Sequence, residues 1–223
     1  MKKFPWLWFC LAWLLGGAIG AAPAEPLQPP QQVIQDTATR LRVLMEREAG
    51  RLRDDPAYIQ QLAEEVLVPQ IHLGQLSAAI LGRHWRQASS AQQQAFAAEL
   101  KHFMVRTYAT ALRELGHWEI SFLPLRLGDG QTDALVRTRV SRSGAPPLSM
   151  DYRMCLRDGR WQAYDLSIEG IGLAANYRTG FAQTIEQKGL DGLIEDLAAR
   201  NAERLNRAGA GASRGAAGAG DGG

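Results

Sequence analysis

The spacing of apolar residues changes once along this chain, near residue 117, and that change limits the possible folds more than any other feature. Before it, apolar residues recur every three or four positions, as in the stretch from Phe96 to Leu115. After it, they alternate with polar residues, as at Ile120 and Phe122. The first spacing is typical of an amphipathic helix and the second of a half-buried strand. The sequence therefore predicts a helical part followed by a sheet.

Alternation continues in four stretches after residue 117. The stretches are 120–122, 134–140, 148–156 and 164–168. Glycine, proline, aspartate and serine mark the turns between them, at 128–130, 143–147 and 158–159. Short turns of this composition join antiparallel neighbours, and alternation makes one face of such a sheet apolar and the other polar. We predict a four-stranded antiparallel meander.

Helical spacing occurs on both sides of the predicted sheet in the sequence. The predicted helices are 33–50, 55–69, 71–82 and 89–116 before the sheet, and 173–188 and 191–207 after it. The longest of them begins at Ser89 and Ser90, each followed three residues later by a glutamine, Gln92 or Gln93, and either pair can cap a helix reciprocally. Because helices and strands come in separate runs, the expected fold class is α+β, with the helices packed on one face of the sheet.

Both ends of the chain differ in composition from the part between them. Two lysines, an uncharged apolar run and several small residues make up residues 1–24, the layout of a cleaved secretory signal peptide. Residues 207–223 are mostly glycine and alanine and are expected to be disordered. The folded domain is therefore predicted to cover 25–206. With the signal peptide removed, Cys155 is the one remaining cysteine, so an internal disulfide is not expected.

Charge and motifs argue against several functional classes. The formal net charge is only +2, so no broad basic surface for nucleic acid is expected. The four histidines are not at metal-ligand spacing, and no glycine-rich phosphate loop or GxSxG motif is present. We expect neither a metal nor a cofactor, and the chain is not expected to be an enzyme.

Three carboxylates lie in the alternating stretches or just beyond them. Asp151, Asp165 and Glu169 fall on the predicted polar face, where Arg137 and Arg153 also lie. Cross-strand neighbours of opposite charge commonly pair, so a solvated or ion-paired face is the expected arrangement. An aspartate turned inward into a small cavity, with a raised pKa, is the alternative that would permit catalysis.

Large, flexible apolar residues are abundant on the apolar sheet face and on the long helix. Methionine and aromatic side chains are suited to lining an adaptable cavity. Periodicity alone favours an ordinary packed core over a cavity, which leaves a ligand-free adaptor protein as a third interpretation. Only the three-dimensional arrangement of the helices on the sheet distinguishes a packed core from a cavity.

Several stretches together resemble the MlaC family, the periplasmic phospholipid-binding components of the Mla lipid-transport system. The stretches are 81–89, Phe96, 106–109, 158–165, 168–171, 176–178, Phe181 and 189–194. The order WxxYD, IEG and NYRxxF is the most specific part, and the resemblance covers about residues 30–206. The sequence departs from the family pattern at Gly172, where a serine is expected, and in the glycine- and alanine-rich tail.

The resemblance implies an α+β fold that encloses a deep apolar cavity for acyl chains and leaves the head group near the mouth. It implies a periplasmic carrier of phospholipid between membrane complexes that maintain outer-membrane lipid asymmetry. The implied partners are an inner-membrane MCE-domain protein of the Mla ABC transporter and an outer-membrane lipoprotein–porin complex. We expect a monomer.

The residues expected to contact lipid come from the sheet, the long helix and the helix after the last strand. They are Phe103, Met104, Tyr108, Val136, Met150, Tyr152, Met154, Tyr164, Leu166, Ile168, Leu173, Tyr177 and Phe181. Arg106, Arg153 and Arg178 are candidate cations for the lipid phosphate, although a surface or docking role is the alternative for each.

Overall fold

The structure of the chain, a computed structural model, describes residues 26–55, 57–115 and 118–217. Side chains are described for 26–55, 57–109 and 118–203. The predicted signal peptide, residues 1–24, lies outside the described residues, as do residues 218–223 of the predicted tail. The limits of the predicted domain therefore stay predictions.

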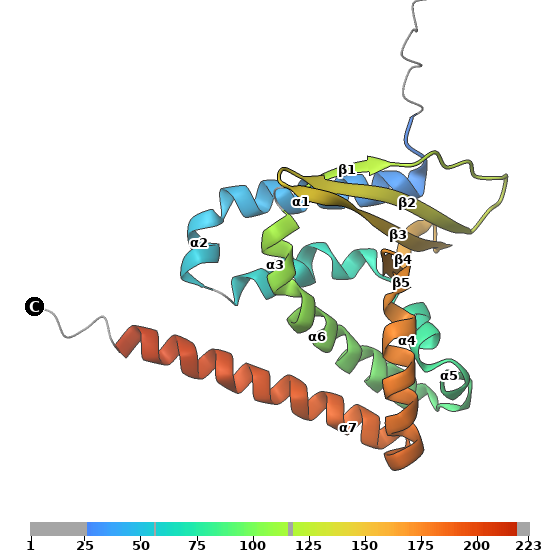
Figure 1. The fold of residues 1–223 in the computed structure, drawn as a ribbon. Coiled ribbons are helices and arrows are strands. Elements are labelled where there is room, and N and C mark those ends of the chain that lie inside the picture. Colours follow the sequence, from blue (N-terminus) through green and yellow to red (C-terminus); the bar gives the residue numbers. More distant parts are fainter. Residues whose placement is uncertain (1–25, 56, 116–117, 218–223) are drawn as a thin grey trace, which may run out of the picture.

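Helices occupy the first half of the described chain, as predicted (Figure 1). They are α1 (Pro29–Arg47), α2 (Ala49–Asp54), α3 (Tyr58–Val66), the 3-10 helix η1 (Val68–Gln70), α4 (Leu73–Leu81), α5 (Arg83–Gln87) and α6 (Ser90–Leu115). The single helix predicted for 33–50 is wrong in extent, because α1 ends at Arg47 and α2 begins after Glu48. Pro29 and Pro30 start α1, positions where the missing amide hydrogen costs nothing. Of the two predicted caps of α6, the Ser89–Gln92 pair forms: the two side chains each accept the other's backbone N–H, at 3.2 and 3.0 Å.

The sheet is antiparallel throughout and its strands lie in sequence order, as the meander prediction requires. The strands are β1 (Glu119–Phe122), β2 (Asp133–Arg142), β3 (Ala145–Arg157), β4 (Arg160–Ile168) and β5 (Ile171–Gly172). The prediction of four strands missed β5, which is too short to alternate. A tight turn with positive φ at Glu169 and Gly170 joins it to β4. The register places Tyr152 opposite both Val136 and Leu166, so these three share the inner face.

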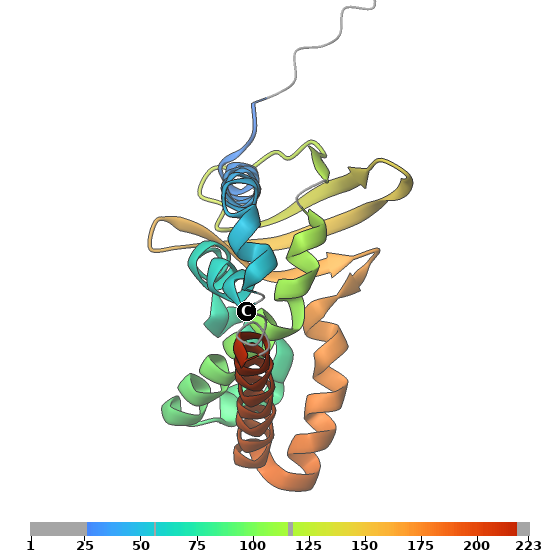
Figure 2. The same cartoon turned by 90° about the vertical axis from the view of Figure 1, so that its left-hand side faces the viewer.

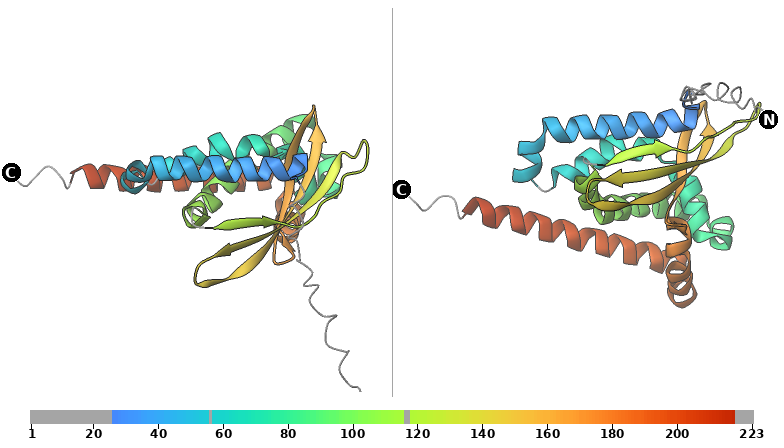
Figure 3. Two further views of the ribbon diagram at one scale, coloured as in Figure 1. Left: turned by 90° about the horizontal axis from the view of Figure 1, so that it is seen from above. Right: turned by 45° about the horizontal axis from the view of Figure 1, so that its top comes forward.

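The last helix, α7 (Leu173–Ala217), has two segments that meet at Gly189. Gly189 has φ 76°, which breaks the helix and is readily adopted by glycine. The two predicted helices correspond to these segments. Residues 207–217, which composition predicts to lack structure, are helical here as the end of α7. Figure 3 shows α1 and the second segment of α7 extending in the same general direction away from the sheet.

Three groups of buried residues hold the layers together. The first joins α1, α2, α3 and α6 around Leu62 and Val105, and we call it the helical cluster. The second joins α4, α6 and α7 around Phe96 and Phe181, and we call it the aromatic cluster. The third, the sheet cluster, packs Ile34 of α1 against β2, β3 and β4. Figure 2 shows the result, with the sheet at one end of the molecule and α6 and the first segment of α7 running away from it.

Polar contacts add to the packing between the long helices. Asn201 of α7 is 5% exposed, and its Nδ2 donates to the Glu99 carbonyl of α6 at 3.1 Å and to the Glu99 carboxylate at 2.7 Å. A buried amide with these partners fixes how α7 lies along α6, because any shift would leave buried polar atoms without hydrogen bonds.

We predict that Asn201→Ala lowers the free energy of unfolding by about 1–3 kcal/mol, the usual cost of losing hydrogen bonds at a buried site. Urea unfolding monitored by circular dichroism measures the change. Asn176→Ala is the matched control, because Asn176 lies on the same helix with an exposed side chain. Equal stability of the two variants would contradict the assigned role of Asn201.

Candidate functional site

A cavity of about 830 Å³ lies between the inner face of the sheet and the helices beneath it. The sheet contributes Ile120, Val140, Leu148, Met150, Tyr152, Met154, Ala163, Tyr164, Leu166 and Ile168. The helices contribute Val33, Ile34, Leu41, Met45, Ala63, Leu67, Leu76, Met104, Val105, Tyr108, Ala109 and Leu173. A cavity of this size with a mainly apolar lining is typical of a small-molecule site and not of a close-packed core.

Nine of the thirteen residues predicted to contact lipid line this cavity. They are Met104, Tyr108, Met150, Tyr152, Met154, Tyr164, Leu166, Ile168 and Leu173. Those on β3 and β4 reach it because the alternation places them on the inner face. Met104 and Tyr108 are four residues apart and therefore share one face of α6. Lining the cavity is a matter of geometry, and contact with lipid remains a proposal.

The other four predicted residues lie outside the cavity lining. Val136 is fully buried in the sheet cluster with Ile34 of α1, so helix packing covers it. Phe103, Tyr177 and Phe181 belong to the aromatic cluster, where Phe103 and Tyr177 meet edge to face with ring centroids 5.4 Å apart. Phe103 directly precedes Met104, and one helical step turns its side chain towards α7 instead of the sheet.

Sequence reasoning missed the contribution of α1 to the cavity. Val33, Leu41 and Met45 fall at helical spacing within the predicted helix 33–50, but this spacing alone does not distinguish core packing from cavity lining. Trp118, between α6 and β1, was also missed, because it lies at the point where the period changes and belongs to neither pattern. Residues brought together by the fold from positions 33 to 173 carry no common local signal.

A bulge in β4 reshapes the cavity wall. The register places Arg153 opposite Asp165 but Met154 opposite Ala163, so Tyr164 is an extra residue in β4. A bulge of this kind turns the strand and re-aims its side chains. As a result Tyr164, Asp165 and Leu166 all line the cavity, although strict alternation would have turned Asp165 away from it.

Asp165 is therefore not on the solvated polar face where the alternation places it. Its Oδ1 accepts the N–H of Leu166 at 2.9 Å and that of Ala174 at 3.0 Å. Ala174 is in the first turn of α7, so the carboxylate of Asp165 caps this helix, an arrangement that the helix dipole favours. Gly172, the departure from the family pattern, immediately precedes this helix and has no side chain to act as a cap. The cap ties β4 to the start of α7.

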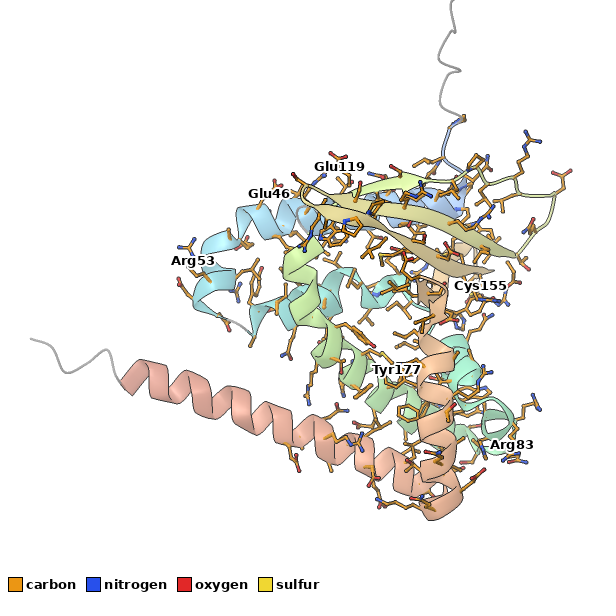
Figure 4. The ribbon with its side chains drawn as sticks, in the orientation of Figure 1. Glu46, Arg53, Arg83, Glu119, Cys155 and Tyr177 are labelled. Atoms are coloured by element: carbon orange, nitrogen blue, oxygen red, sulfur yellow. The ribbon has the colours of Figure 1, made fainter. Side chains whose placement is uncertain are left out.

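Exposure changes along the cavity. At the end formed by α3 and α4 its lining residues are buried, with Ala63 3% and Leu76 4% exposed. At the other end the lining includes the exposed polar residues Arg42, Glu119 and Ser121. The cavity therefore has an apolar deep end and a polar rim. The rim is formed by α1 and β1, and Figure 4 shows Glu119 near the tip of the β2–β3 hairpin.

Two tyrosine hydroxyl groups connect the cavity to the aromatic cluster. The hydroxyls of Tyr108, which lines the cavity, and Tyr177, which does not, are 2.8 Å apart and hydrogen-bonded. Burial, followed by this hydrogen bond, raises the pKa of Tyr177 above the ordinary tyrosine value. The pair joins α6 to α7 beside the cavity.

The three candidate cations have different surroundings. Arg178 donates from Nε and Nη2 to the carbonyl of Ala79, at 3.1 and 2.5 Å, and so ties α7 to α4. Arg153 is exposed on the outer sheet face, and Arg106 on α6 is half-buried. None of these three lines the cavity, whereas Arg42 and Lys101 do.

Within the described residues, no group of three or more His, Cys, Asp or Glu side chains could hold a metal ion. His72 caps α4, where its Nδ1 accepts the Gln75 N–H at 3.0 Å. Cys155 is buried, and burial raises its pKa above the ordinary thiol value. No helix in the described part of the chain is both long and apolar enough to cross a membrane.

Comparisons with known proteins agree with this geometry. The family model described as MlaC protein matches residues 35–199. The intermembrane phospholipid transport system binding protein MlaC of Haemophilus influenzae is 21% identical over 194 residues, covering 85% of this chain and 91% of that protein. The toluene tolerance protein ttg2D of Pseudomonas putida is 24% identical over 165 residues, covering 74% of this chain and 76% of that protein.

A solved structure with a bound ligand is also similar to this chain. It is the phospholipid-binding protein from Ralstonia solanacearum, determined in complex with a phospholipid. The TM-score is 0.70 and the sequence identity 28%, with 79% of this chain and 98% of the other chain covered. The α+β fold class is thereby confirmed, with five strands in place of the predicted four.

Burial in the cavity wall raises the pKa of Tyr152 from about 10 to about 12, because the charged phenolate loses hydration there. The folded protein therefore binds this proton more tightly than the unfolded chain does. The resulting stabilisation is complete below pH 10 and is lost as the pH rises from about 10 to about 12. We predict that, as the pH rises from about 10 to about 12, the unfolding free energy of the wild type falls relative to that of Tyr152→Phe. Urea unfolding of both proteins in this range measures it, and a difference that does not change with pH would contradict the assignment.

Proposed function

The chain belongs to the MlaC protein family, and on that premise we propose that it is a periplasmic carrier that holds a phospholipid in the cavity and moves it between membranes. The observation that supports this most directly is the apolar cavity of about 830 Å³ between sheet and helices. A protein similar to this chain over 98% of its own length has been determined with a phospholipid bound. Lipid is accordingly the cargo and not a cofactor.

The energetics of a free lipid explain why such a carrier needs a cavity of this kind. Burying one CH2 group is worth about 0.8 kcal/mol, so exposing two long acyl chains to water costs on the order of 20 kcal/mol. Methionine, leucine and aromatic side chains in the wall replace the bilayer interior during transfer. Flexible methionines such as Met104 and Met150 can adapt to chains of different length and unsaturation.

Transfer through such a cavity moves lipid between two apolar environments, so its net free energy is close to zero. Direction must then come from the partners. Following the family, we propose an inner-membrane MCE-domain protein of the Mla ABC transporter and an outer-membrane lipoprotein–porin complex as these partners. In this scheme the carrier is a monomer, and its action maintains outer-membrane lipid asymmetry.

A carrier role is favoured over catalysis by the surroundings of Asp165, which lines the cavity. Asp165 already accepts two backbone N–H groups and caps α7. A carboxylate held by two backbone N–H groups at the start of a helix acts as a structural acceptor. We therefore do not assign it as a general acid. A ligand-free adaptor with a dry core is disfavoured because native cores are close-packed and leave few voids larger than a water molecule.

We predict that Leu166→Asp abolishes the phospholipid that co-purifies with the mature protein. Its carboxylate would project into the apolar wall, where an unpaired charge is strongly unfavourable next to acyl chains. Leu166→Trp, which fills the cavity without adding charge, should lower the lipid content as well. Phosphate analysis of organic extracts gives the moles of phospholipid per mole of protein, and a vesicle-to-vesicle transfer assay gives the carrier activity.

Leu135→Asp is the matched control, because Leu135 is 47% exposed on the outer face of the sheet. It should retain wild-type lipid content and transfer. Circular dichroism of all three variants separates loss of lipid from loss of folding. Wild-type lipid content in both folded Leu166 variants would rule out the cavity as the lipid site.

A further inference from the structure

Trp118 stands out in the cavity lining because its indole nitrogen is buried without a hydrogen-bond partner among the described residues. Most buried polar groups in proteins are hydrogen-bonded, because a buried donor without a partner destabilises the structure. An indole N–H can only donate, so the missing partner has to be an acceptor. An oxygen atom of a bound ligand would supply the acceptor that the Trp118 N–H group lacks.

The position of Trp118 is fixed by the elements around it. It directly precedes β1, whose first residue, Glu119, pairs with Ser141 of β2. The next residue of β2, Arg142, places its guanidinium 5.0 Å from the centroid of the Trp118 ring. A cation over an indole face is an attractive contact, so the ring is held in place by a neighbouring strand. A donor held in this way loses little entropy when it binds an acceptor.

The location within the cavity indicates which part of a lipid would meet this donor. Trp118 directly precedes Glu119, and both residues line the cavity where it carries the polar rim. The opposite end is lined by buried apolar residues such as Leu76. An amphiphile would place its tails at the apolar end and its oxygen-bearing part at the rim. Indole groups are well suited to such a boundary, because the ring is apolar and the N–H needs a partner.

We propose that the Trp118 Nε1–H group donates a hydrogen bond to an oxygen of the bound phospholipid, in its glycerol ester or phosphate region, and so fixes the depth at which the lipid sits. This inference rests on the proposed carrier function and identifies a polar contact within the same cavity. The shared chemistry is a lipid oxygen acceptor near the junction of head group and tails. An ester carbonyl and a phosphate oxygen are the two possible sources.

A competition between two lipids distinguishes these sources. The mature protein is incubated with vesicles that contain equal amounts of a diacyl phospholipid and its dialkyl ether analogue, which keeps the phosphate but lacks both ester carbonyls. Mass spectrometry of the re-isolated protein gives the ester-to-ether ratio and the total occupancy. A bond to the carbonyl predicts an ester preference of about threefold to tenfold in wild type, the effect expected of one hydrogen bond, and a ratio near one in Trp118→Phe.

A bond to the phosphate predicts a ratio near one in both proteins and a lower total occupancy in Trp118→Phe. Phenylalanine keeps an aromatic ring beside Arg142 and removes only the donor, and the lipid ratio is measured within one sample, so altered stability does not mimic the effect. Trp85→Phe is the matched control, because Trp85 packs on the aromatic cluster away from the cavity lining. It should match wild type in ratio and occupancy.

Nuclear magnetic resonance of indole-labelled protein is a second readout. The Trp118 N–H signal, identified by its absence in Trp118→Phe, should shift when lipid is loaded. Identical ratio and occupancy in wild type and Trp118→Phe, with no shift of this signal, would overturn the inference while leaving the carrier intact. Failure of the wild-type protein to take up either lipid would instead overturn the proposed function itself.

Discussion

The inner face of the sheet is packed tightly in one region and left uncovered in another, and the rest of the structure depends on this division. Ala134, Val136 and Met154 are buried against α1 and Trp161, whereas Met150, Tyr152 and Leu166 on the same face remain half-buried around the cavity. An apolar surface of this kind would normally collapse onto the nearest helix. The helices do not close over it because they are held to one another through the helical and aromatic clusters. The cavity is the space that these two clusters keep open.

Specific polar contacts connect the cavity wall to the helices and the helices to one another. The bulge in β4 brings Asp165 to the first turn of α7, and the Tyr108–Tyr177 pair joins α6 to the same helix. Asn201 then fixes the far segment of α7 along α6. Each contact satisfies polar groups that would be costly to bury alone, so the arrangement is defined without filling the cavity. A rigid frame around an adaptable, methionine-rich wall fits a carrier that accepts varied acyl chains.

Much of this fold could be predicted from local patterns, and the failures have identifiable causes. The change of period located the sheet, and the Ser89–Gln92 pair located the start of α6. The strand β5 was missed because two residues cannot alternate. Val136 and Phe103, which are predicted to contact lipid, lie outside the cavity lining, because alternation and helical spacing identify a face and not what covers it. Asp165 was placed on the wrong face because of the bulge in β4, and Trp118 was overlooked because it lies at the junction between α6 and β1. Both features depend on contacts between residues that are far apart in the sequence. The expectation of a cavity came from the resemblance to the MlaC family, because periodicity alone does not predict a cavity.

The central claim is that the cavity is a phospholipid site. Native mass spectrometry of the mature protein, purified without detergent from a bacterial periplasm, tests it most directly. Our account predicts a complex heavier than the polypeptide by the mass of bound phospholipid, with the lipid identified after dissociation in the gas phase. A mass equal to that of the polypeptide alone, with no lipid recovered by organic extraction of the same sample, would contradict it.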